Sequence, residues 1–392
     1  MGCCKPKPLI QNIFIYKIPQ LGKKYTKVGK GRMIPQIQPW IGEEEVKSVY
    51  EQIKSGWISE GQRAKEFEEE IKKLTGAKHA ISCMNGTIAL FIAIKALGIG
   101  RGDEVIVPDM TFIATANAAI MAGAVPVFCD IDRGTFNLSP TALRAKISER
   151  TKAIIPVHLY GQSAAMHEIM AIAKASNLFV IEDAAEALGV KLDGKHVGTF
   201  GNMGTFSFYA NKNVTTGEGG MVITNDDRLA LKAQMLKNHG RKERGSFVHD
   251  KIGYNFSFTD IGAAIGLAQL RKFPEVKRRK SSLLKEYRKQ LEGVKQVSFP
   301  KDAEGCEPVI WFISVLVENP GGLQEYLKTE GIETRRFFYP LHRQPCYKGW
   351  DSNEFPDADW AYEHGLSLPS SATLTKEEVT FVCTKIREFF RA

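Results

Sequence analysis

The sequence contains no apolar run that approaches the roughly 18 residues required for a membrane-spanning helix. It also has no CxxC pair, and its seven cysteines are scattered, which indicates reduced thiols in an intracellular, cytoplasmic protein. No G-x-G-x-x-G follows a strand-like run and opens a helix, which argues against a nicotinamide enzyme. The chain of 392 residues is long enough to bury a large core, and we expect two lobes.

Acidic residues are absent from residues 1–32, which carry eight of the nine net positive charges of the chain. The high isoelectric point therefore belongs to a basic extension and does not indicate a nucleic-acid-binding fold. The opening Met-Gly-Cys-Cys resembles an acylation signal, but Pro6 stands where the myristoylation pattern requires Ser or Thr. We expect residues 1–32 to be a disordered leader, with no membrane span in the chain.

One stretch, residues 206–221, contains a single lysine in a loop between two apolar runs. An aromatic β-type run ends at Tyr209, Lys212 follows, and a glycine-rich turn leads into the second run. Burial can lower the pKa of such a lysine and make it an amine nucleophile. Its natural electrophile is the aldehyde of pyridoxal 5'-phosphate (PLP), joined as a Schiff base. The alternative is a solvated loop lysine.

Three other stretches supply parts that PLP requires. Asp183 follows an apolar run typical of a buried parallel strand, where a carboxylate can pair with the pyridine nitrogen, or simply cap a helix. Gly86 and Thr87 open an apolar helix whose free N–H groups can hold a phosphate, although an ordinary capped helix has the same pattern. Phe112 follows another strand and could cover the ring or lie in the core.

Together these stretches resemble the DegT/DnrJ/EryC1/StrS group of sugar-nucleotide aminotransferases, which are fold-type I PLP enzymes. The resemblance runs from about Met33 to the C-terminus. Four stretches are similar in particular to members that aminate a GDP-linked 4-keto-6-deoxy sugar. They are residues 56–59, 111–117, 156–162 and 211–220.

The resemblance implies a role for each matching residue. Lys212 would be the catalytic Schiff-base lysine, and Asp183 would pair with the pyridinium nitrogen. Glu186 would touch the ring hydroxyl, from one helical turn beyond Asp183 if that segment is helical. The residues expected to hold the phosphate are Gly86, Thr87, Ser207 and, from a neighbouring subunit, Asn238. This last role implies a homodimer with shared active sites, although Asn238 before Gly240 is also a typical helix C-cap.

Three residues lie in segments that border the sugar nucleotide in the family. Trp57 belongs to a loop that interrupts a helical pattern, with core packing as the alternative, and Tyr339 and His342 belong to residues 335–342. The sequence departs from the family at four positions, which leaves the substrate contacts open. They are Ser257, Gly262, Arg336 and Tyr339.

The order of apolar runs predicts an α/β protein. Strand-like and helical stretches alternate, which favours a mainly parallel, doubly wound sheet with one reversed strand near the glycine-rich turn. The expected strands are residues 80–83, 104–107, 125–129, 153–157, 178–181, 205–209 and 221–224. Residues 33–270 are expected to form the PLP-binding domain. Residues 271–392 are expected to form a linker helix, with a kink or break at Pro274, and a small α+β lobe with a strand over residues 309–317.

Two other motifs are unconvincing. Residues 189–195 match the phosphate-loop spacing, but His196 replaces the hydroxyl residue that binds Mg²⁺, and the segment resembles a polar hairpin. Asp130 and Asp132 resemble a metal-binding pair, but a turn fits them better, and we expect no metal.

The resemblance implies transfer of an amino group from L-glutamate to C4 of a GDP-linked 4-keto-6-deoxy sugar, as in O-antigen and lipopolysaccharide synthesis. UDP- and dTDP-linked sugars remain alternatives. A PLP-dependent sugar dehydratase is a related possibility, but that branch typically has histidine where Lys212 stands. A non-catalytic regulator on the same fold is the third alternative.

Overall fold

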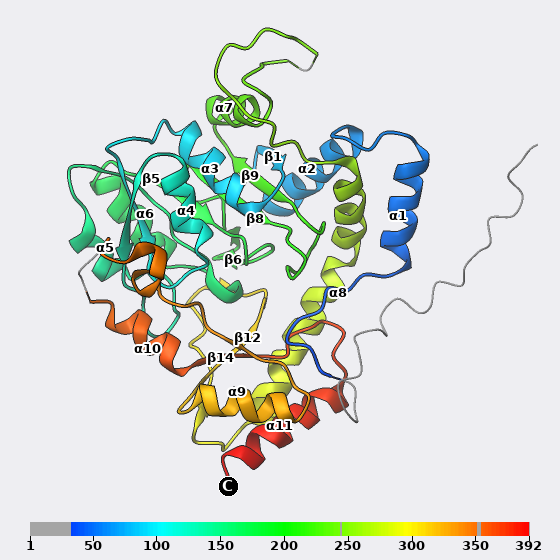
Figure 1. Cartoon of the computed structure of the whole chain (residues 1–392), viewed down its shortest axis with the longest axis vertical. Coiled ribbons are helices and arrows are strands. Elements are labelled where there is room, and N and C mark those ends of the chain that lie inside the picture. The colour runs from blue at the N-terminus through cyan, green and yellow to red at the C-terminus, as the bar shows by residue number, and fades with distance from the viewer. Residues whose placement is uncertain (1–32, 244, 351–353, 392) are drawn as a thin grey trace, which may run out of the picture.

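The computed structural model describes residues 33–243, 245–350 and 354–391. The expected basic extension, residues 1–32, lies outside the described residues. Figure 1 shows a large lobe above and a smaller lobe below, joined by the long helix α8 (Asp260–Gln290). No helix within the described ranges combines the length and the apolar character that crossing a bilayer requires.

The large lobe is built on a seven-stranded sheet with the order β1-β9-β8-β5-β4-β2-β3. Strand β9 runs antiparallel to both of its neighbours, and the other strand pairs are parallel, so the prediction of one reversed strand is confirmed. The strands are β1 (His79–Cys83), β2 (Glu104–Pro108), β3 (Val125–Cys129), β4 (Thr151–Ile154), β5 (Phe179–Asp183), β8 (Met203–Ser207) and β9 (Gly220–Thr224).

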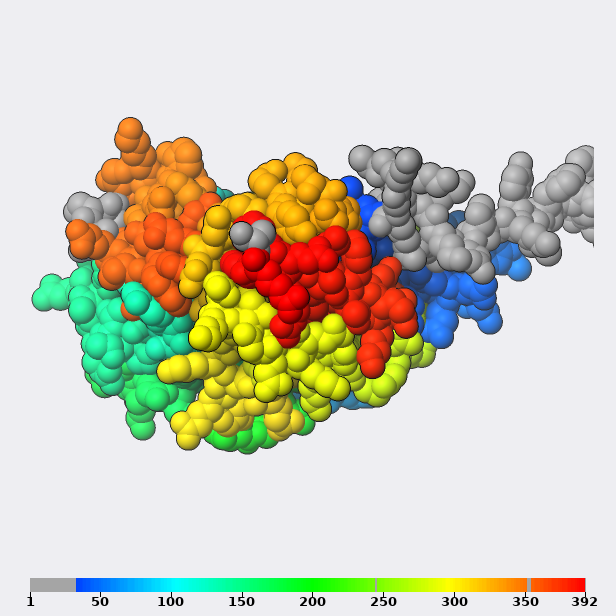
Figure 2. All heavy atoms as spheres, turned by 90° about the horizontal axis from the view of Figure 1, so that it is seen from below, coloured from blue at the N-terminus to red at the C-terminus, as the bar shows by residue number. Residues whose placement is uncertain are grey.

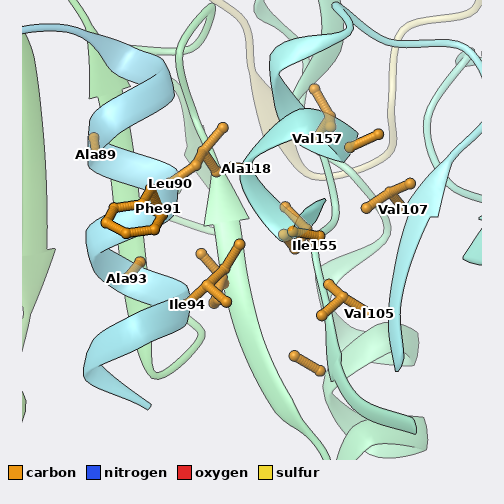
Figure 3. Packing of buried hydrophobic residues seen from close by; sticks show 14 of the residues in the cluster. Ala89, Leu90, Phe91, Ala93, Ile94, Val105, Val107, Ala118, Ile155 and Val157 are labelled. Carbon is orange, nitrogen blue, oxygen red and sulfur yellow. The ribbon is translucent and has the colours of Figure 1, made fainter. Parts of the chain in front are cut away.

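Helices connect the parallel strands, as expected for a doubly wound fold. They are α3 (Gly86–Ala96), α4 (Ala114–Met121), α5 (Pro140–Lys146) and α6 (Met166–Ala175), whereas α7 (Asp227–Lys237) follows the antiparallel strand β9. Helix α3 is apolar on nearly every face and is buried. Figure 3 shows its residues Leu90 and Ile94 packing towards the sheet, near Val105 and Ile155. The start of α3 is thus held rigidly at the edge where the parallel strands end.

The end of α8 that belongs to the large lobe packs against α1 (Glu43–Lys54) and α2 (Gln62–Thr75). The Asp260 carboxylate accepts hydrogen bonds from the backbone N–H groups of Gly61 and Ala64, at 2.7 and 3.0 Å, and so caps α2. We expected a kink or a break at Pro274, and helix α8 continues through this residue, so the break is wrong. Its later residues Leu283 and Tyr287 belong to the core of the small lobe.

The small lobe contains a four-stranded antiparallel sheet with the order β10-β12-β14-β13, which confirms the α+β prediction. Its strands are β10 (Val297–Ser298), β12 (Ile313–Val317), β13 (Arg335–Arg336) and β14 (Gly365–Leu368). Its helices are α9 (Pro320–Thr329), α10 (Pro356–His364) and α11 (Lys376–Phe389). Seen from below in Figure 2, α11 lies along the surface beside the end of α8.

Several expected strand boundaries are wrong. Strand β4 ends at Ile154 because Pro156 has no N–H to donate to a ladder. Strand β8 begins at Met203 and ends at Ser207, two residues earlier than predicted. Of the strand predicted over residues 309–317, only Ile313–Val317 forms, and the preceding residues run beside the pocket described below.

The polar segment at residues 189–195 does form a hairpin, with β6 (Lys191–Leu192) paired antiparallel to β7 (Lys195–His196). A third short strand, β11 (Cys306–Glu307), completes this small sheet.

The two aspartates that resemble a metal pair are engaged by backbone N–H groups. Asp132 accepts from Thr135 at 2.9 Å, and Asp130 accepts from Ala358 at 2.9 Å, at the start of α10. The interpretation of this segment as a turn is therefore confirmed.

Candidate active site

Lys212 lies in the loop between β8 and β9, and the loop is closed by its own hydrogen bonds. The backbone N–H of Lys212 donates to the Tyr209 carbonyl at 2.9 Å, and that of Thr216 donates to the Phe208 carbonyl at 2.9 Å. The amide of Asn213 donates to the Ile310 carbonyl at 3.1 Å, which ties the loop to the segment before β12. Only 13% of the Lys212 side chain is exposed, so the alternative of a solvated loop lysine is wrong.

The amine of Lys212 faces a carboxylate and an aromatic ring. Its Nζ lies 3.8 Å from Oε1 of Glu186 and 3.8 Å from the ring centre of Trp311. Burial lowers the pKa of Lys212, although the charges of Glu186 and Asp183 oppose this shift. The residue therefore has the two properties of an amine nucleophile, a fixed position and a weakened hold on its proton.

Asp183 is the last residue of β5 and is buried beside the same amine. The Thr115 hydroxyl donates to Oδ2 at 2.8 Å, and the Ala185 N–H donates to Oδ1 at 3.2 Å. Burial raises the pKa of Asp183, and the hydrogen bonds from Thr115 and Ala185 limit that rise. No helix begins after Asp183, so its interpretation as a helix cap is wrong. A cation arriving beside this carboxylate would be stabilised.

The neighbouring residue Glu182 explains why the end of β5 is rigid. Its side chain accepts from the backbone N–H groups of Gly198, Phe200 and Gly201 at 2.6, 2.6 and 2.7 Å. Glu182 also pairs with Nε2 of the fully buried His158 at 2.9 Å. The His158 Nδ1 accepts from Ala164 N–H at 3.1 Å, so the proton that meets Glu182 is on Nε2.

Glu186 reaches the amine from a turn. Residues 184–188 do not form the helix that we considered for this segment. Its Oε2 accepts a 2.9 Å hydrogen bond from the backbone N–H of Tyr160. Tyr160 has a φ of 55°, a left-handed conformation that is uncommon for a bulky residue and that recurs at functional sites. Burial raises the pKa of Glu186 to about 7, against the opposing charge of Lys212. Glu186 can therefore exchange a proton near neutral pH.

The start of α3 and the end of β8 meet in a narrow contact. A Cβ added at Gly86 would lie 2.9 Å from Cβ of Ser207, so only glycine lets the two elements approach this closely. Asn85 caps α3 by accepting from Ile88 N–H at 2.9 Å. This leaves the N–H groups of Gly86 and Thr87 pointing out of the helix start, beside the Ser207 hydroxyl. Such an arrangement suits an anion.

Two of the expected site residues are exposed aromatic side chains. Phe112 follows β2, is 57% exposed and lies 6.1 Å from Phe338, ring centre to ring centre. Trp57 lies between α1 and α2, is also 57% exposed, and donates from Nε1 to the Glu60 carbonyl at 3.3 Å. Core packing is therefore the wrong interpretation for both. Their exposure in a single chain is consistent with contacts to a ligand or to a second subunit.

Asn238 is not held at the Lys212 pocket of its own chain. It is the C-cap residue of α7, as the local pattern indicated, and its Oδ1 accepts from the Arg241 guanidinium at 2.7 Å. Its neighbour Lys237 is buried, with Nζ 3.0 Å from the Glu60 carboxylate and 2.7 Å from the Ser82 carbonyl. The position of Asn238 is thus firmly fixed by the end of α7.

The segment from β13 to residue 342 closes the small-lobe side of the pocket. His342 Nδ1 lies 2.6 Å from the Asp109 carboxylate at the end of β2, and its Nε2 lies 3.6 Å from Asp359. Burial alone would lower the pKa of His342, but the hydrogen bond and charge of Asp109, with the charge of Asp359, raise it. Tyr339 is 36% exposed and packs edge-on against Tyr362. His342 therefore ties the two lobes together.

Sequence reasoning missed three residues beside Lys212, namely Trp311, Tyr160 and Arg335. Tyr160 stacks on Phe338 with an interplanar angle of 4°, and Trp311 stacks on Phe312 at a centroid distance of 3.7 Å. The Arg335 guanidinium lies 5.6 Å above the Phe312 ring, and its charge lowers the pKa of Glu186 after the larger effects of burial and Lys212. For Trp311 the sequence signal was a pair of adjacent aromatic residues, Trp311 and Phe312, within the strand predicted over residues 309–317.

Arg336, the departure from the family next to Arg335, points to the other side. Its guanidinium donates to the Tyr362 carbonyl at 2.5 Å and to the Gly365 carbonyl at 3.3 Å, between α10 and β14. At Gly262, another departure, an added Cβ would lie 2.9 Å from the Phe258 ring. Ser257 donates its N–H to Asn255 Oδ1 at 3.4 Å. Arg336 and Gly262 therefore serve the packing of this chain.

Comparison with known proteins agrees with this geometry. The model of the DegT/DnrJ/EryC1/StrS aminotransferase family matches residues 39–387. GDP-perosamine synthase of Escherichia coli O157:H7 is 42% identical over 363 residues, covering 92% of this chain and 99% of that protein. A pleiotropic regulatory protein of Geobacillus stearothermophilus is 40% identical over 363 residues, covering 91% and 96%.

A solved structure also matches over nearly its whole length. The PLP form of Spr1654 from Streptococcus pneumoniae superposes with a TM-score of 0.86 at 29% identity, covering 92% of this chain and 99% of that one. The family match spans most of the chain, and the lysine, the two carboxylates and the helix start lie together at one edge of the sheet. The chain belongs to the DegT/DnrJ/EryC1/StrS aminotransferase family.

Proposed function

We propose that this protein is a PLP-dependent aminotransferase that moves the amino group of L-glutamate to C4 of a 4-keto-6-deoxy sugar nucleotide. The substrate is GDP-4-keto-6-deoxymannose and the product GDP-perosamine, as the relative from E. coli O157:H7 supports by its name. The observation that carries the proposal is the buried Lys212 amine, 3.8 Å from Glu186 and beside Asp183. A product of this kind suits O-antigen and lipopolysaccharide synthesis in the cytoplasm.

The residues present fit PLP. Asp183 would pair with the pyridinium nitrogen, and Glu186 would meet the ring hydroxyl. Gly86, Thr87 and Ser207 would hold the phosphate through N–H groups and a hydroxyl, with Phe112 against a ring face. Two buried acceptor atoms that flank Lys212, Oδ1 of Asn211 and Oδ1 of Asn213, have no hydrogen-bond partner among the described residues. Unpaired buried atoms beside a reactive amine suit a pocket shaped for a polar ligand.

When bound, PLP supplies a ring that withdraws the electron pair left when the donor loses its α-proton. Lys212 would hold the cofactor through its Nζ, and the same amine would lie beside the reacting atoms when the donor is bound. Its Nζ would then move the proton of the donor α-carbon. Glu186 can hold a proton within reach of Nζ, since its pKa is raised to about 7.

The two substrates would contact different residues. L-Glutamate brings carboxylates, and Arg335 is a guanidinium over Phe312 whose charge acts on both Lys212 and Glu186. We assign the donor carboxylate to Arg335. The sugar nucleotide would lie against Trp57, Tyr339 and the segment held by His342. Because the His342 imidazole is already bound to Asp109, its contribution is to hold this segment in place.

A homodimer with shared active sites completes the proposal. Helix α1 exposes Tyr50 and Ile53, at 58% and 56%, and these residues line an apolar groove of about 550 Å³ that continues to Gly217 after Lys212. A second copy is the occupant that this surface fits, because the phosphate site lacks Asn238 from its own chain. In the dimer, Asn238 of one copy would reach the phosphate in the other.

A non-catalytic regulator remains the second candidate, because the relative from G. stearothermophilus is named as a regulatory protein. L-Glutamate separates the two functions. An aminotransferase converts the visible absorbance of bound PLP to that of its amino form, and a regulator leaves it unchanged. The substrate is tested by offering the GDP-, UDP- and dTDP-linked 4-keto-6-deoxy sugars together with glutamate. Amination of the UDP or dTDP sugar alone would refute the GDP assignment and leave the enzyme class intact.

A further inference from the structure

Helix α8 contains a lysine whose burial the reaction does not explain. Lys280 is 2% exposed, and its Nζ donates to the Trp311 backbone carbonyl at 2.7 Å. Within the described part of the chain, this is the one hydrogen bond recorded for that amine, and no carboxylate pairs with it. Burial lowers the pKa of Lys280 to about 7. Burying a lysine amine without an anion lowers the stability of the fold. Such a position therefore calls for a functional explanation.

The Trp311 carbonyl is one of three points at which this residue is held, and a second is its backbone N–H, which donates to the Tyr160 carbonyl at 3.4 Å. Its indole Nε1–H donates to the Asn211 carbonyl at 2.9 Å, directly before Lys212. The ring also stacks on Phe312. Lys280 therefore holds the backbone of Trp311, and Asn211 holds its ring. Between these points the indole face lies 3.8 Å from Nζ of Lys212.

We infer that Lys280 is a positioning residue for Lys212: it fixes Trp311 so that the indole face covers the reacting amine. The inference rests on Lys212 being the reacting amine of the proposed function. An indole face attracts an ammonium ion, so the cover favours the protonated form while excluding water from one side of Nζ. Trp311 thus opposes the effect of burial and keeps Lys212 able to carry a proton as well as to lose one.

The other charged groups around the amine act independently of Trp311. Asp183 at the end of β5 and Glu186 in the turn after it favour the protonated form of Lys212. Arg335, from β13, disfavours that form. Substitution of Trp311 or Lys280 leaves these three groups in place. A change in the proton affinity of Lys212 in such variants therefore reports the cover itself.

The test measures the amine directly in the full-length, cofactor-free protein. Trace labelling with acetic anhydride over a pH series, with the acetylated Lys212 peptide quantified by mass spectrometry, gives the apparent pKa of Lys212. Trp311→Leu keeps an apolar cover and removes the π face, and it is expected to lower this pKa by about one unit. Lys280→Met removes only the donor to the Trp311 carbonyl, and a smaller shift in the same direction is expected.

The double variant decides whether Lys280 acts through Trp311. Lys280→Met combined with Trp311→Leu is expected to show the shift of Trp311→Leu alone, because no indole remains to be positioned. Additive shifts, an unchanged pKa in Lys280→Met, or a raised pKa in Trp311→Leu would each overturn the inference. If Trp311→Leu does not fold, Trp311→Phe takes its place, with a smaller downward shift expected.

A control on the same helix separates this effect from general changes in stability. Lys285 is exposed, and Lys285→Met removes the same charge from α8 without touching Trp311. Thermal unfolding confirms that each variant is folded at the pH of labelling. Lys285→Met is expected to leave the Lys212 pKa unchanged, and a shift equal to that of Lys280→Met would contradict the inference. The labelling does not depend on turnover, so it remains informative if the proposed aminotransfer fails.

Discussion

The carboxylate of Glu186 and the amine of Lys212 lie 3.8 Å apart and are buried together, with their pKa values displaced in opposite directions. Burial raises the pKa of the acid and lowers that of the amine, so both lie nearer to neutrality than in water. An acid and an amine poised in this way can exchange a proton at little cost.

Lys212→Ala is expected to reduce turnover by about 10³-fold or more, because in the proposed function the same amine would tether the cofactor and move the proton. Lys212→Arg is the matched variant, since it retains a cation beside Glu186 but supplies no amine nucleophile. Both should fold, as judged by thermal unfolding, and both should lack the visible absorbance of lysine-bound PLP. Full turnover by either variant would remove Lys212 from the mechanism.

The raised pKa of Glu186 has a consequence for stability in the cofactor-free protein. Its folded-state pKa of about 7 lies above the usual 4.5, so the folded protein holds this proton more tightly than the unfolded chain. The stabilisation is fully present below pH 4.5 and is lost as the pH rises to about 7. Glu186→Gln should remove this loss of stability. The melting temperatures of the wild-type and Glu186→Gln proteins, measured across this pH range, would test the expectation. Parallel pH curves for the two proteins would show that Glu186 is not protonated in the fold.

Asp183→Asn should separate stability from catalysis. Because burial raises the pKa of Asp183, the ionised carboxylate weakens the cofactor-free fold, so the neutral amide should raise the melting temperature at pH 7. The glutamate half-reaction should slow by roughly 10- to 100-fold, since a charged hydrogen bond to the ring nitrogen is lost. A variant that is more stable and equally fast would contradict the role of Asp183.

Arg335→Gln should raise the KM for L-glutamate by roughly 10- to 100-fold, the value of a charged hydrogen bond to a carboxylate. The half-reaction with the sugar nucleotide should change far less. Arg336→Gln is the matched control, because Arg336 is held by the backbone of Tyr362 and Gly365 and points away. A weakened sugar half-reaction with normal glutamate kinetics would assign Arg335 to the diphosphate of the acceptor.

Shared active sites predict complementation between two inactive variants. When Lys212→Ala and Asn238→Ala proteins are mixed and allowed to exchange subunits, half of the dimers become mixed and one of the two sites in each is intact. About a quarter of the normal turnover should then return. If mass spectrometry shows mixed dimers but no turnover returns, Asn238 serves the site of its own chain. An active Asn238→Ala protein would mean that Asn238 serves no site.

The residues proposed as reacting groups could be singled out from the sequence because their signals are local. A single lysine between an aromatic strand and a glycine-rich turn, and an aspartate at the end of an apolar strand, can be recognised within a few residues. The match to the family model and to full-length relatives supports the fold that these signals indicated. The proposed role of Glu186 came from resemblance alone, and the structure carries this residue on a turn and not on a helix.

The surroundings of Lys212 could not be predicted, because they come from distant parts of the chain. Trp311 and Asn211 are separated by 100 positions, and only the packing of β12 beside the loop brings them together. Tyr160 reaches Glu186 through a backbone conformation that no pattern signals. The strand predicted over residues 309–317 failed for the same reason, since its first half forms part of the pocket.

Transfer of nitrogen from L-[¹⁵N]glutamate tests the proposed function most directly. The purified protein with PLP is incubated with the labelled donor and GDP-4-keto-6-deoxymannose, and the products are analysed by mass spectrometry, with Lys212→Ala as the control. We expect one ¹⁵N atom in a GDP-linked amino sugar, formed together with 2-oxoglutarate and absent from the control. If the protein binds PLP but transfers no ¹⁵N from glutamate to any of the three 4-keto sugar nucleotides, the proposed function is contradicted.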